Sequence, residues 1–178
     1  MIVLFAGTKS YEKGIITLIE SLKKLWRSGN RVELVSIGPS TREFDYYINK
    51  QSIKVRRHVH DLGIVNEDEK KSIFYSCDIV ALPSISESFG ITYLEAWICK
   101  KPVIGCKIGA VRELIEDNQD GILVSFGDRD ELAAVLKRLI EDSTMRNSLG
   151  ENGYKKVISI YDSRKCLSEF EKLCESLI

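Results

Sequence analysis

The chain has 178 residues, of which 44% are apolar, and its 26 basic side chains are balanced by 26 acidic ones. This length is enough for one globular domain, and the balanced charge excludes a general nucleic-acid binder, whose affinity for phosphate needs an excess of Lys and Arg. No apolar run approaches the roughly 20 residues that span a bilayer, and five cysteines without metal-ligand spacing indicate reduced thiols in a cytosolic protein.

Strand-like apolar runs alternate along the chain with segments of helical period. The alternation continues to residue 141, and residues 145–178 carry a helical pattern without a strand signal. Asp128 and Glu131 have the spacing of a helix-capping pair. In chain order the pattern predicts a strand at 1–7, a helix at 14–26, a strand at 31–38, a helix at 41–50, a poorly bounded strand within 53–63, a helix at 66–77, a strand at 78–83, a helix at 90–99, a strand at 102–106, a helix at 111–117, a strand at 121–125 and a helix at 128–141.

This alternation predicts a single α/β domain with a doubly wound, Rossmann-like parallel sheet, because parallel strands need helical crossovers that cover both faces. In such sheets, ligands bind beyond the carboxyl ends of the strands, where loops lead into helix N-termini. The stretch PSISESFGITYLEAW, residues 83–97, has this position. Gly90 lies at the predicted helix entrance, where unpaired backbone N–H groups and the helix dipole favour a phosphate group.

Two glutamates, Glu87 and Glu95, stand eight positions apart in this stretch. If the segment were helical throughout, their separation along the axis would be roughly 12 Å, which is too wide for the paired carboxylates of a glycoside hydrolase. The spacing suits a ligand with a central phosphate and a hydroxyl-rich sugar at each end, the shape of a nucleotide-sugar. The alternative is that Glu87 caps a loop and Glu95 is an ordinary surface residue of a helix.

The same residues resemble a known family. PSISESFGITYLEAWICKKPVIGCKIGAVRELIEDNQDGILV is similar to the C-terminal signature of the group 1 retaining glycosyltransferases of the GT-B fold. LFAGTKSYEKGIITLIESL resembles the first strand and phosphate loop of that family, VELVSIGPS its second strand, and DELAAVLKRLIED its late helix. The resemblance covers roughly residues 1–155 and implies a nucleotide-sugar-binding domain, the C-terminal half of a GT-B enzyme.

The resemblance also implies roles for individual residues. Glu95 would accept hydrogen bonds from the ribose hydroxyls, and Glu87 would face the transferred hexose. Lys13 matches the family's phosphate-binding lysine, which balances the charge of the leaving group. The backbone would meet the sugar and diphosphate at Phe89, Gly90, Ile91 and Thr92, and would approach the nucleotide at Gly7 and Gly38, while Ile64 would lodge the base. The alternatives are a loop lysine at 13, glycines that serve only turns, and an Ile64 that belongs to the core.

Two positions depart from the family pattern. The family usually has an arginine after the first glycine as a second phosphate ligand, whereas this chain has Thr8 followed by Lys9. Lys9 would replace the arginine imperfectly, because an ammonium lacks the guanidinium fork. Lys100 stands where the family commonly ends the motif helix with glycine, so we expect local strain or a shifted helix end.

The implied reaction is hexose transfer from a UDP-, GDP- or ADP-sugar to an acceptor hydroxyl with retention, in polysaccharide or glycolipid synthesis. No cofactor or metal is expected, because the helix dipole and Lys13 supply the charge stabilisation. The resemblance implies that the N-terminal acceptor-binding domain is absent and that a helix at about 163–177 contacts it. The chain is then either an excised domain, the alternative we favour, or a subunit that works with a separate acceptor-binding subunit. An isolated domain would then be inactive alone. Peripheral association of the full enzyme with the inner face of the membrane is a family-level expectation.

Two other functions remain open: a nucleotide-sugar epimerase of similar fold, and a non-catalytic nucleotide-sugar-binding subunit. A dinucleotide dehydrogenase is disfavoured because no GxGxxG follows the first strand. His58 and His60 alternate on one strand face, but no nearby Cys or carboxylate pattern completes a metal set, so we expect solvated or packing histidines.

Overall fold

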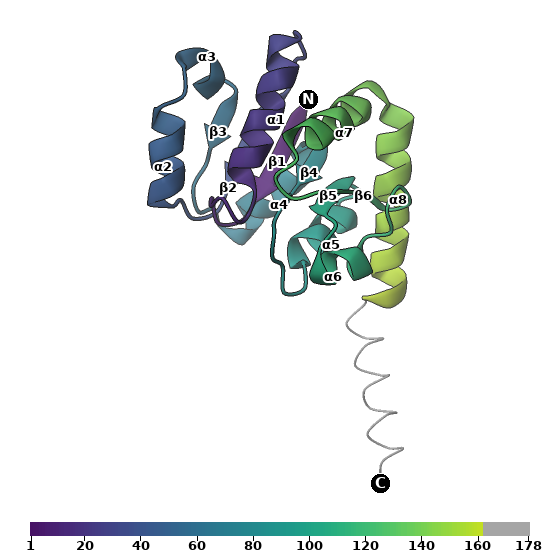
Figure 1. The fold of residues 1–178 in the computed structure, drawn as a ribbon. Coiled ribbons are helices and arrows are strands. Elements are labelled where there is room, and N and C mark those ends of the chain that lie inside the picture. The colour runs from purple at the N-terminus through teal and green to yellow at the C-terminus, as the bar shows by residue number, and fades with distance from the viewer. Residues whose placement is uncertain (162–178) are drawn as a thin grey trace.

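The computed structural model describes residues 1–161, which form one six-stranded parallel sheet flanked by helices (Figure 1). The strand order is β3-β2-β1-β4-β5-β6. The elements are β1 (Ile2–Ala6), α1 (Ile15–Arg27), β2 (Glu33–Ile37), α2 (Arg42–Asn49), α3 (Ile53–Arg56), β3 (Val59–Asp61), α4 (Glu67–Ser76), β4 (Ile79–Ala81), α5 (Ile91–Ile98), β5 (Val103–Cys106), α6 (Gly109–Leu114), β6 (Gly121–Val124), α7 (Arg129–Glu141) and α8 (Ser143–Ile160).

The sheet is the centre of the hydrophobic core. Strand β1 pairs with β2 on one side and with β4 on the other, so the strand order reverses between β1 and β4. Strands β4, β5 and β6 are buried along their whole length, as their unbroken apolar runs predict. Helix α1 packs beside α7, and α5 packs beside α8 (Figure 1). The predicted doubly wound α/β fold is therefore confirmed.

Most predicted elements are present with shifted ends. The segment 53–63 holds the predicted strand, but it is short, and the one-turn helix α3 precedes it because the side chain of Ser52 caps the amide of Val55. Asp128 caps α7 as predicted, whereas the carboxylate of Glu131 accepts from the amide of Ser125 rather than from that of Asp128. The helix predicted at about 163–177 lies outside the described residues.

Helix α5 ends with a lysine in the left-handed region. Lys100 has a φ of 55°, and the amides of Lys100 and Lys101 bond to the carbonyls of Trp97 and Ala96 at 2.8 and 2.9 Å. This is the geometry that glycine usually supplies after a helix, so the expected strain at this position is confirmed. The side chain also pairs with Glu151 of α8, with 2.9 Å between Nζ and Oε2.

Two of the cysteines within residues 1–161 are buried thiols. Burial raises the pKa of Cys77 and of Cys106 to about 12, which keeps both in the unreactive thiol form. Cys99 is half-buried, and all three are free cysteines. Within residues 1–161, no helix combines the length and the apolar character needed to cross a membrane.

Candidate functional site

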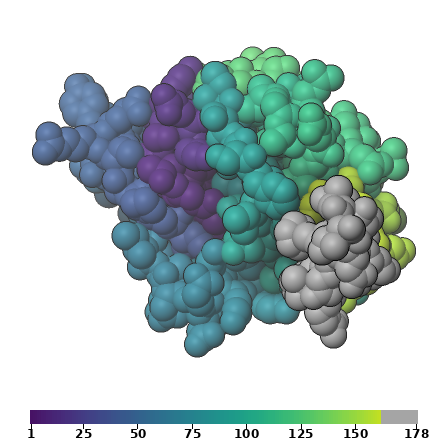
Figure 2. Space-filling model, turned by 90° about the horizontal axis from the view of Figure 1, so that it is seen from below, coloured from purple at the N-terminus to yellow at the C-terminus, as the bar shows by residue number. Residues whose placement is uncertain are grey.

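The candidate site lies where the strand order reverses, beyond the carboxyl ends of β1 and β4. The chain leaves β1 toward α1 and β2 on one side, and it leaves β4 toward α5 and β5 on the other. The loops that follow these two strands, residues 7–14 and 82–90, therefore meet at one end of the sheet (Figure 2). In a doubly wound sheet this crevice is the usual ligand site.

These two loops are in direct backbone contact. Gly14 precedes α1 with a φ of 83°, and a Cβ atom added to it would lie 2.1 Å from the carbonyl oxygen of Pro83. The amide of Ile85 donates to the carbonyl of Glu12 at 2.8 Å. The left-handed conformation and the close approach both require glycine at position 14. The backbone thus fixes the spacing between the two loops.

An ion pair joins the two predicted catalytic residues across this contact. Lys13 Nζ lies 2.8 Å from Glu87 Oε1 and 3.1 Å from the carbonyl oxygen of Ser86. The side chain of Lys13 is 35% exposed and that of Glu87 is 18% exposed. The structure therefore brings Lys13 and Glu87 together where the two loops meet, with both side chains partly exposed.

Gly90 forms the N-terminal boundary of α5, as its sequence position predicts. Its φ is 85°, and an added Cβ atom would lie 2.8 Å from the Tyr93 ring and 2.9 Å from Leu114. The hydroxyl of Tyr93 donates to the carbonyl of Leu82 at 2.8 Å, and burial holds the pKa of Tyr93 well above its ordinary value. A buried neutral phenol thus supports the turn that presents the first amides of α5 to the crevice.

Gly7 and Gly38 bring the ends of β1 and β2 together. Gly38 has a φ of 114°, and an added Cβ atom would lie 2.4 Å from the carbonyl oxygen of Gly7. Beside them is a hollow of about 310 Å³. Its lining also includes Ile64, Lys70 and Thr92. Four residues predicted to meet different parts of the donor therefore share one concave surface: Gly7, Gly38, Ile64 and Thr92.

Lys9 is fully buried, whereas its neighbour Thr8 is exposed. The ammonium of Lys9 lies 3.0 Å from Asp61 Oδ1 and donates to the carbonyl of Gly38. It therefore ties the loops that follow β1 and β2 to the last residue of β3. Lys9, the candidate substitute for the family's arginine, thus pairs with other groups of the protein.

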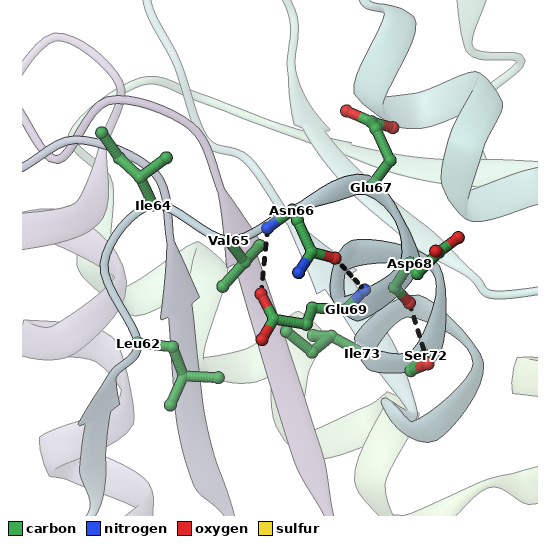
Figure 3. A pocket seen from close by; sticks show the side chains of 9 residues that line it. All are labelled: Leu62, Ile64, Val65, Asn66, Glu67, Asp68, Glu69, Ser72 and Ile73. Atoms are coloured by element: carbon green, nitrogen blue, oxygen red, sulfur yellow. Dashed lines mark hydrogen bonds between the residues drawn. The ribbon is translucent and has the colours of Figure 1, made fainter.

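Ile64 lies on the surface, which rules out the alternative that it belongs to the core. Its side chain is 79% exposed and borders both the 310 Å³ hollow and a larger one of about 800 Å³. The charged residues that line the larger hollow are all acidic (Figure 3). They are Glu67, Asp68 and Glu69 at the start of α4.

Glu95 is paired with a lysine of the neighbouring helix. Lys70 Nζ of α4 lies 2.5 Å from Glu95 Oε1 of α5. Helix α4 is held at this position by a capping box, in which Asn66 and Glu69 exchange hydrogen bonds between side chain and backbone (Figure 3). Glu95 is thus not a lone solvated carboxylate, because a lysine of the neighbouring helix pairs with it.

Two exposed apolar side chains flank the start of α5. Phe89 is 51% exposed and makes an edge-to-face contact with Tyr161, with ring centroids 6.0 Å apart. Ile91 is 63% exposed. The backbone between them carries the amides that are predicted to meet the sugar and diphosphate.

His58 and His60 both contact Glu33, with ring nitrogens 3.0 Å from its two carboxylate oxygens. Burial raises the pKa of Glu33, but the hydrogen bonds with the two histidines outweigh it and hold the pKa below its ordinary value. The His58 ring stacks on Trp26 at 5.0 Å. Among residues 1–161, no cluster of three or more histidine, cysteine and acidic side chains is arranged to hold a metal ion.

Sequence reasoning missed two residues that contact the predicted site. Lys70 lies 25 positions before Glu95, and Asp61 lies 52 positions after Lys9, so no local spacing indicates either pair. The sequence does place Lys70 in the first turn of α4, because this lysine directly follows Glu69 of the capping box.

Known proteins resemble this chain over most of its length. The family model described as "Glycosyl transferases group 1" matches residues 1–156. An alpha-D-kanosaminyltransferase of Streptomyces kanamyceticus is 30% identical over 153 residues, which cover 85% of this chain and 39% of that protein.

Two solved structures have the same fold. The crystal structure of HepE from Anabaena in complex with UDP matches with a TM-score of 0.87 at 25% identity, over 98% of this chain and 48% of that one. The crystal structure of the C-terminal domain of LpcC, a glycosyl transferase group 1 family protein from Francisella tularensis, matches with a TM-score of 0.80 at 28% identity, over 91% and 86% of the two chains. The chain spans about half the length of the HepE chain and of curated relatives that it matches.

Proposed function

Because the chain belongs to the group 1 glycosyltransferases, we propose that it forms the donor-binding half of a retaining enzyme. That enzyme transfers a hexose from a nucleoside-diphosphate sugar to an acceptor hydroxyl. The observation that carries this proposal is the Lys13–Glu87 pair, 2.8 Å apart, at the meeting point of the loops that follow β1 and β4. It places a cation and a carboxylate beside the N-terminus of α5, where a diphosphate and a sugar would lie next to each other.

The charges in the crevice match the parts of such a donor. A diphosphate would be met by the ammonium of Lys13 and by the first amides of α5, both of which favour an anion. The hexose would lie against Glu87, and the nucleoside would occupy the 310 Å³ hollow beside Gly7, Gly38 and Ile64, with its ribose toward Glu95. The complex of HepE with UDP supports a nucleoside diphosphate as the ligand class.

The reaction breaks the bond between the anomeric carbon and the diphosphate oxygen and forms a bond from the same carbon to the acceptor oxygen. The electron pair of the broken bond leaves on the diphosphate, which gains negative charge that Lys13 and the dipole of α5 stabilise. The proton of the acceptor hydroxyl passes to the departing diphosphate. Retention requires the acceptor to approach the face from which the diphosphate leaves.

We further propose that this chain alone binds the donor without transferring its sugar. The chain spans 48% of HepE, so residues outside it would have to hold the acceptor. A role in polysaccharide or glycolipid synthesis is supported by a relative, the capsular polysaccharide biosynthesis glycosyltransferase CapM of Staphylococcus aureus, which is 26% identical over 99% of this chain.

The proposal is tested by a thermal-shift screen of the chain against UDP, GDP and ADP and their hexose conjugates. A ligand that binds only the folded state raises the melting temperature by mass action. We expect one diphosphate and its sugar to raise it, with neither transfer to simple acceptors nor epimerisation of the sugar. Absence of any shift at millimolar ligand would contradict the donor site, and an epimerised product would favour the epimerase alternative.

A further inference from the structure

Lys70 makes a contact that its neighbour Lys71 does not. The side chain of Lys70 is 27% exposed, and its Nζ atom lies 2.5 Å from Glu95 Oε1. The side chain of Lys71 is 69% exposed, and its ion pair within residues 1–161 is with Asp68 of its own helix, at 3.7 Å. Two consecutive lysines of α4 thus differ in that Lys70 pairs with Glu95 of α5, while Lys71 is largely exposed and pairs within its own helix.

Lys70 stands between two concave surfaces. It lines the 310 Å³ hollow together with Gly7, Gly38 and Thr92. It also lines a smaller groove of about 240 Å³ between α4 and α5, to which Glu95 belongs, whereas Lys71 borders this groove but not the 310 Å³ hollow. The ammonium is therefore at the border of the space proposed for the nucleoside, and its contact with Glu95 keeps it there.

We propose that Lys70 and Glu95 together recognise the two neighbouring hydroxyls of the donor's ribose, with Lys70 as a specificity-determining residue. The inference rests on the proposed function, because it requires the nucleoside to lie in the hollow. A hydroxyl can both donate and accept a hydrogen bond, whereas a carboxylate only accepts and an ammonium only donates. Glu95 alone can accept a hydrogen bond from each hydroxyl but cannot donate one to it. Lys70 supplies the N–H groups that donate to the hydroxyl oxygens.

The contact leaves both groups with free bonding capacity. An ammonium has three N–H donors, of which Glu95 takes one, and a carboxylate has about four acceptor positions, of which Lys70 takes one. The pair can stay intact while ribose hydroxyls bridge it. A sugar that lacks one hydroxyl would leave a donor or an acceptor unpaired in the site, and sites built to bond a hydroxyl reject such analogues.

The size of the expected preference follows from the exposure of the pair. Both side chains keep roughly a quarter of their surface in contact with solvent, at 27% and 28%, so an unpaired group regains part of its hydration. We therefore expect about a tenfold preference for the ribose form over the 2′-deoxyribose form, at the lower end of discrimination by hydrogen bonding.

The test measures the binding of UDP, GDP and ADP, and then of the 2′-deoxy counterpart of the diphosphate that binds. Titration calorimetry is done on the wild-type chain, on Lys70→Met and on Lys71→Met as the matched control. Lys70→Met should bind the ribose form about tenfold more weakly and lose most of the preference, while Lys71→Met should resemble the wild type. Lys70→Arg, which keeps a cationic donor, should retain part of the preference.

A partly exposed ion pair contributes about 0–1 kcal/mol to stability, so Lys70→Met should fold and melt within a few degrees of the wild type. The variant Glu95→Gln shows whether a negative result concerns the role of Lys70 or the ribose site itself. If Glu95→Gln weakens binding but Lys70→Met keeps both affinity and preference, the role of Lys70 is overturned and the proposed function stands. If no diphosphate binds, or if Glu95→Gln has no effect, the ribose site itself is wrong and the inference falls with it.

Discussion

Replacing Gly14 with alanine should destabilise the protein far more than the same change at Gly29. Both glycines are in the left-handed region, with φ values of 83° and 82°, so both changes incur the same conformational cost of about 1–2 kcal/mol. Around Gly29 no atom lies within 4 Å of an added Cβ, whereas at Gly14 the carbonyl oxygen of Pro83 would be 2.1 Å away. Because that oxygen belongs to the backbone, the loop must move, at a further cost of about 1–3 kcal/mol.

The expected losses in the free energy of unfolding are thus about 1–2 kcal/mol for Gly29→Ala and about 2–5 kcal/mol for Gly14→Ala. For a domain of this size, each kcal/mol lowers the melting temperature by roughly 2–4 °C. Urea denaturation gives the free energies, and a melting scan gives an independent check. Equal losses for the two variants would refute the close contact between the loops that carry Lys13 and Glu87.

Three further changes test other parts of the account. Lys13→Ala should weaken nucleoside-diphosphate binding about ten- to a hundredfold in calorimetry but leave nucleoside binding unchanged, because the lost partner is phosphate; equal losses would place the lysine elsewhere. Gly153→Ala in α8 should lower the free energy of unfolding by about 1–3 kcal/mol in urea denaturation, because the added Cβ would lie 2.0 Å from Cδ1 of the buried Trp97. Helix propensity alone predicts the opposite, so a more stable variant would refute this contact. Hydrogen bonds from Lys107 and from a backbone amide hold the pKa of Glu131 below its ordinary value of 4.5. The carboxylate therefore stabilises the fold fully above pH 4.5, and this stabilisation is lost as the pH falls through the lowered pKa. Glu131→Gln should remove this part of the acid sensitivity in urea midpoints measured from about pH 7 to 3, and a pH profile equal to that of the wild type would contradict the prediction.

The sequence was sufficient for the layout of the fold because strand and helix signals alternate at short range. The succession of strands and helices, and the glycine at the start of α5, follow from apolar runs and from a single glycine after a polar loop, whereas the strand order with its reversal between β1 and β4 was not predicted. The helix α3 was missed because its single turn is shorter than any periodicity that a sequence pattern can define.

The side-chain partners of the site could not be predicted in the same way. The Lys13–Glu87 contact depends on two loops 74 positions apart that meet only through the strand order. Lys9 was expected near phosphate because it stands beside the position of the family's arginine, but its ammonium instead pairs with Asp61 at the end of β3. Such pairs are properties of the tertiary arrangement, and no spacing along the chain encodes them.

The most direct test of the donor site compares two variants with two ligands. Calorimetric titration is done on the wild type, Glu87→Gln and Glu95→Gln, each with the bare nucleoside diphosphate and with the complete nucleotide-sugar. If Glu95 meets the ribose, Glu95→Gln should weaken both ligands alike, by roughly ten- to a hundredfold. If Glu87 meets the hexose, Glu87→Gln should spare the diphosphate and weaken only the nucleotide-sugar. Unchanged affinities in both variants, with the fold intact, would contradict the account.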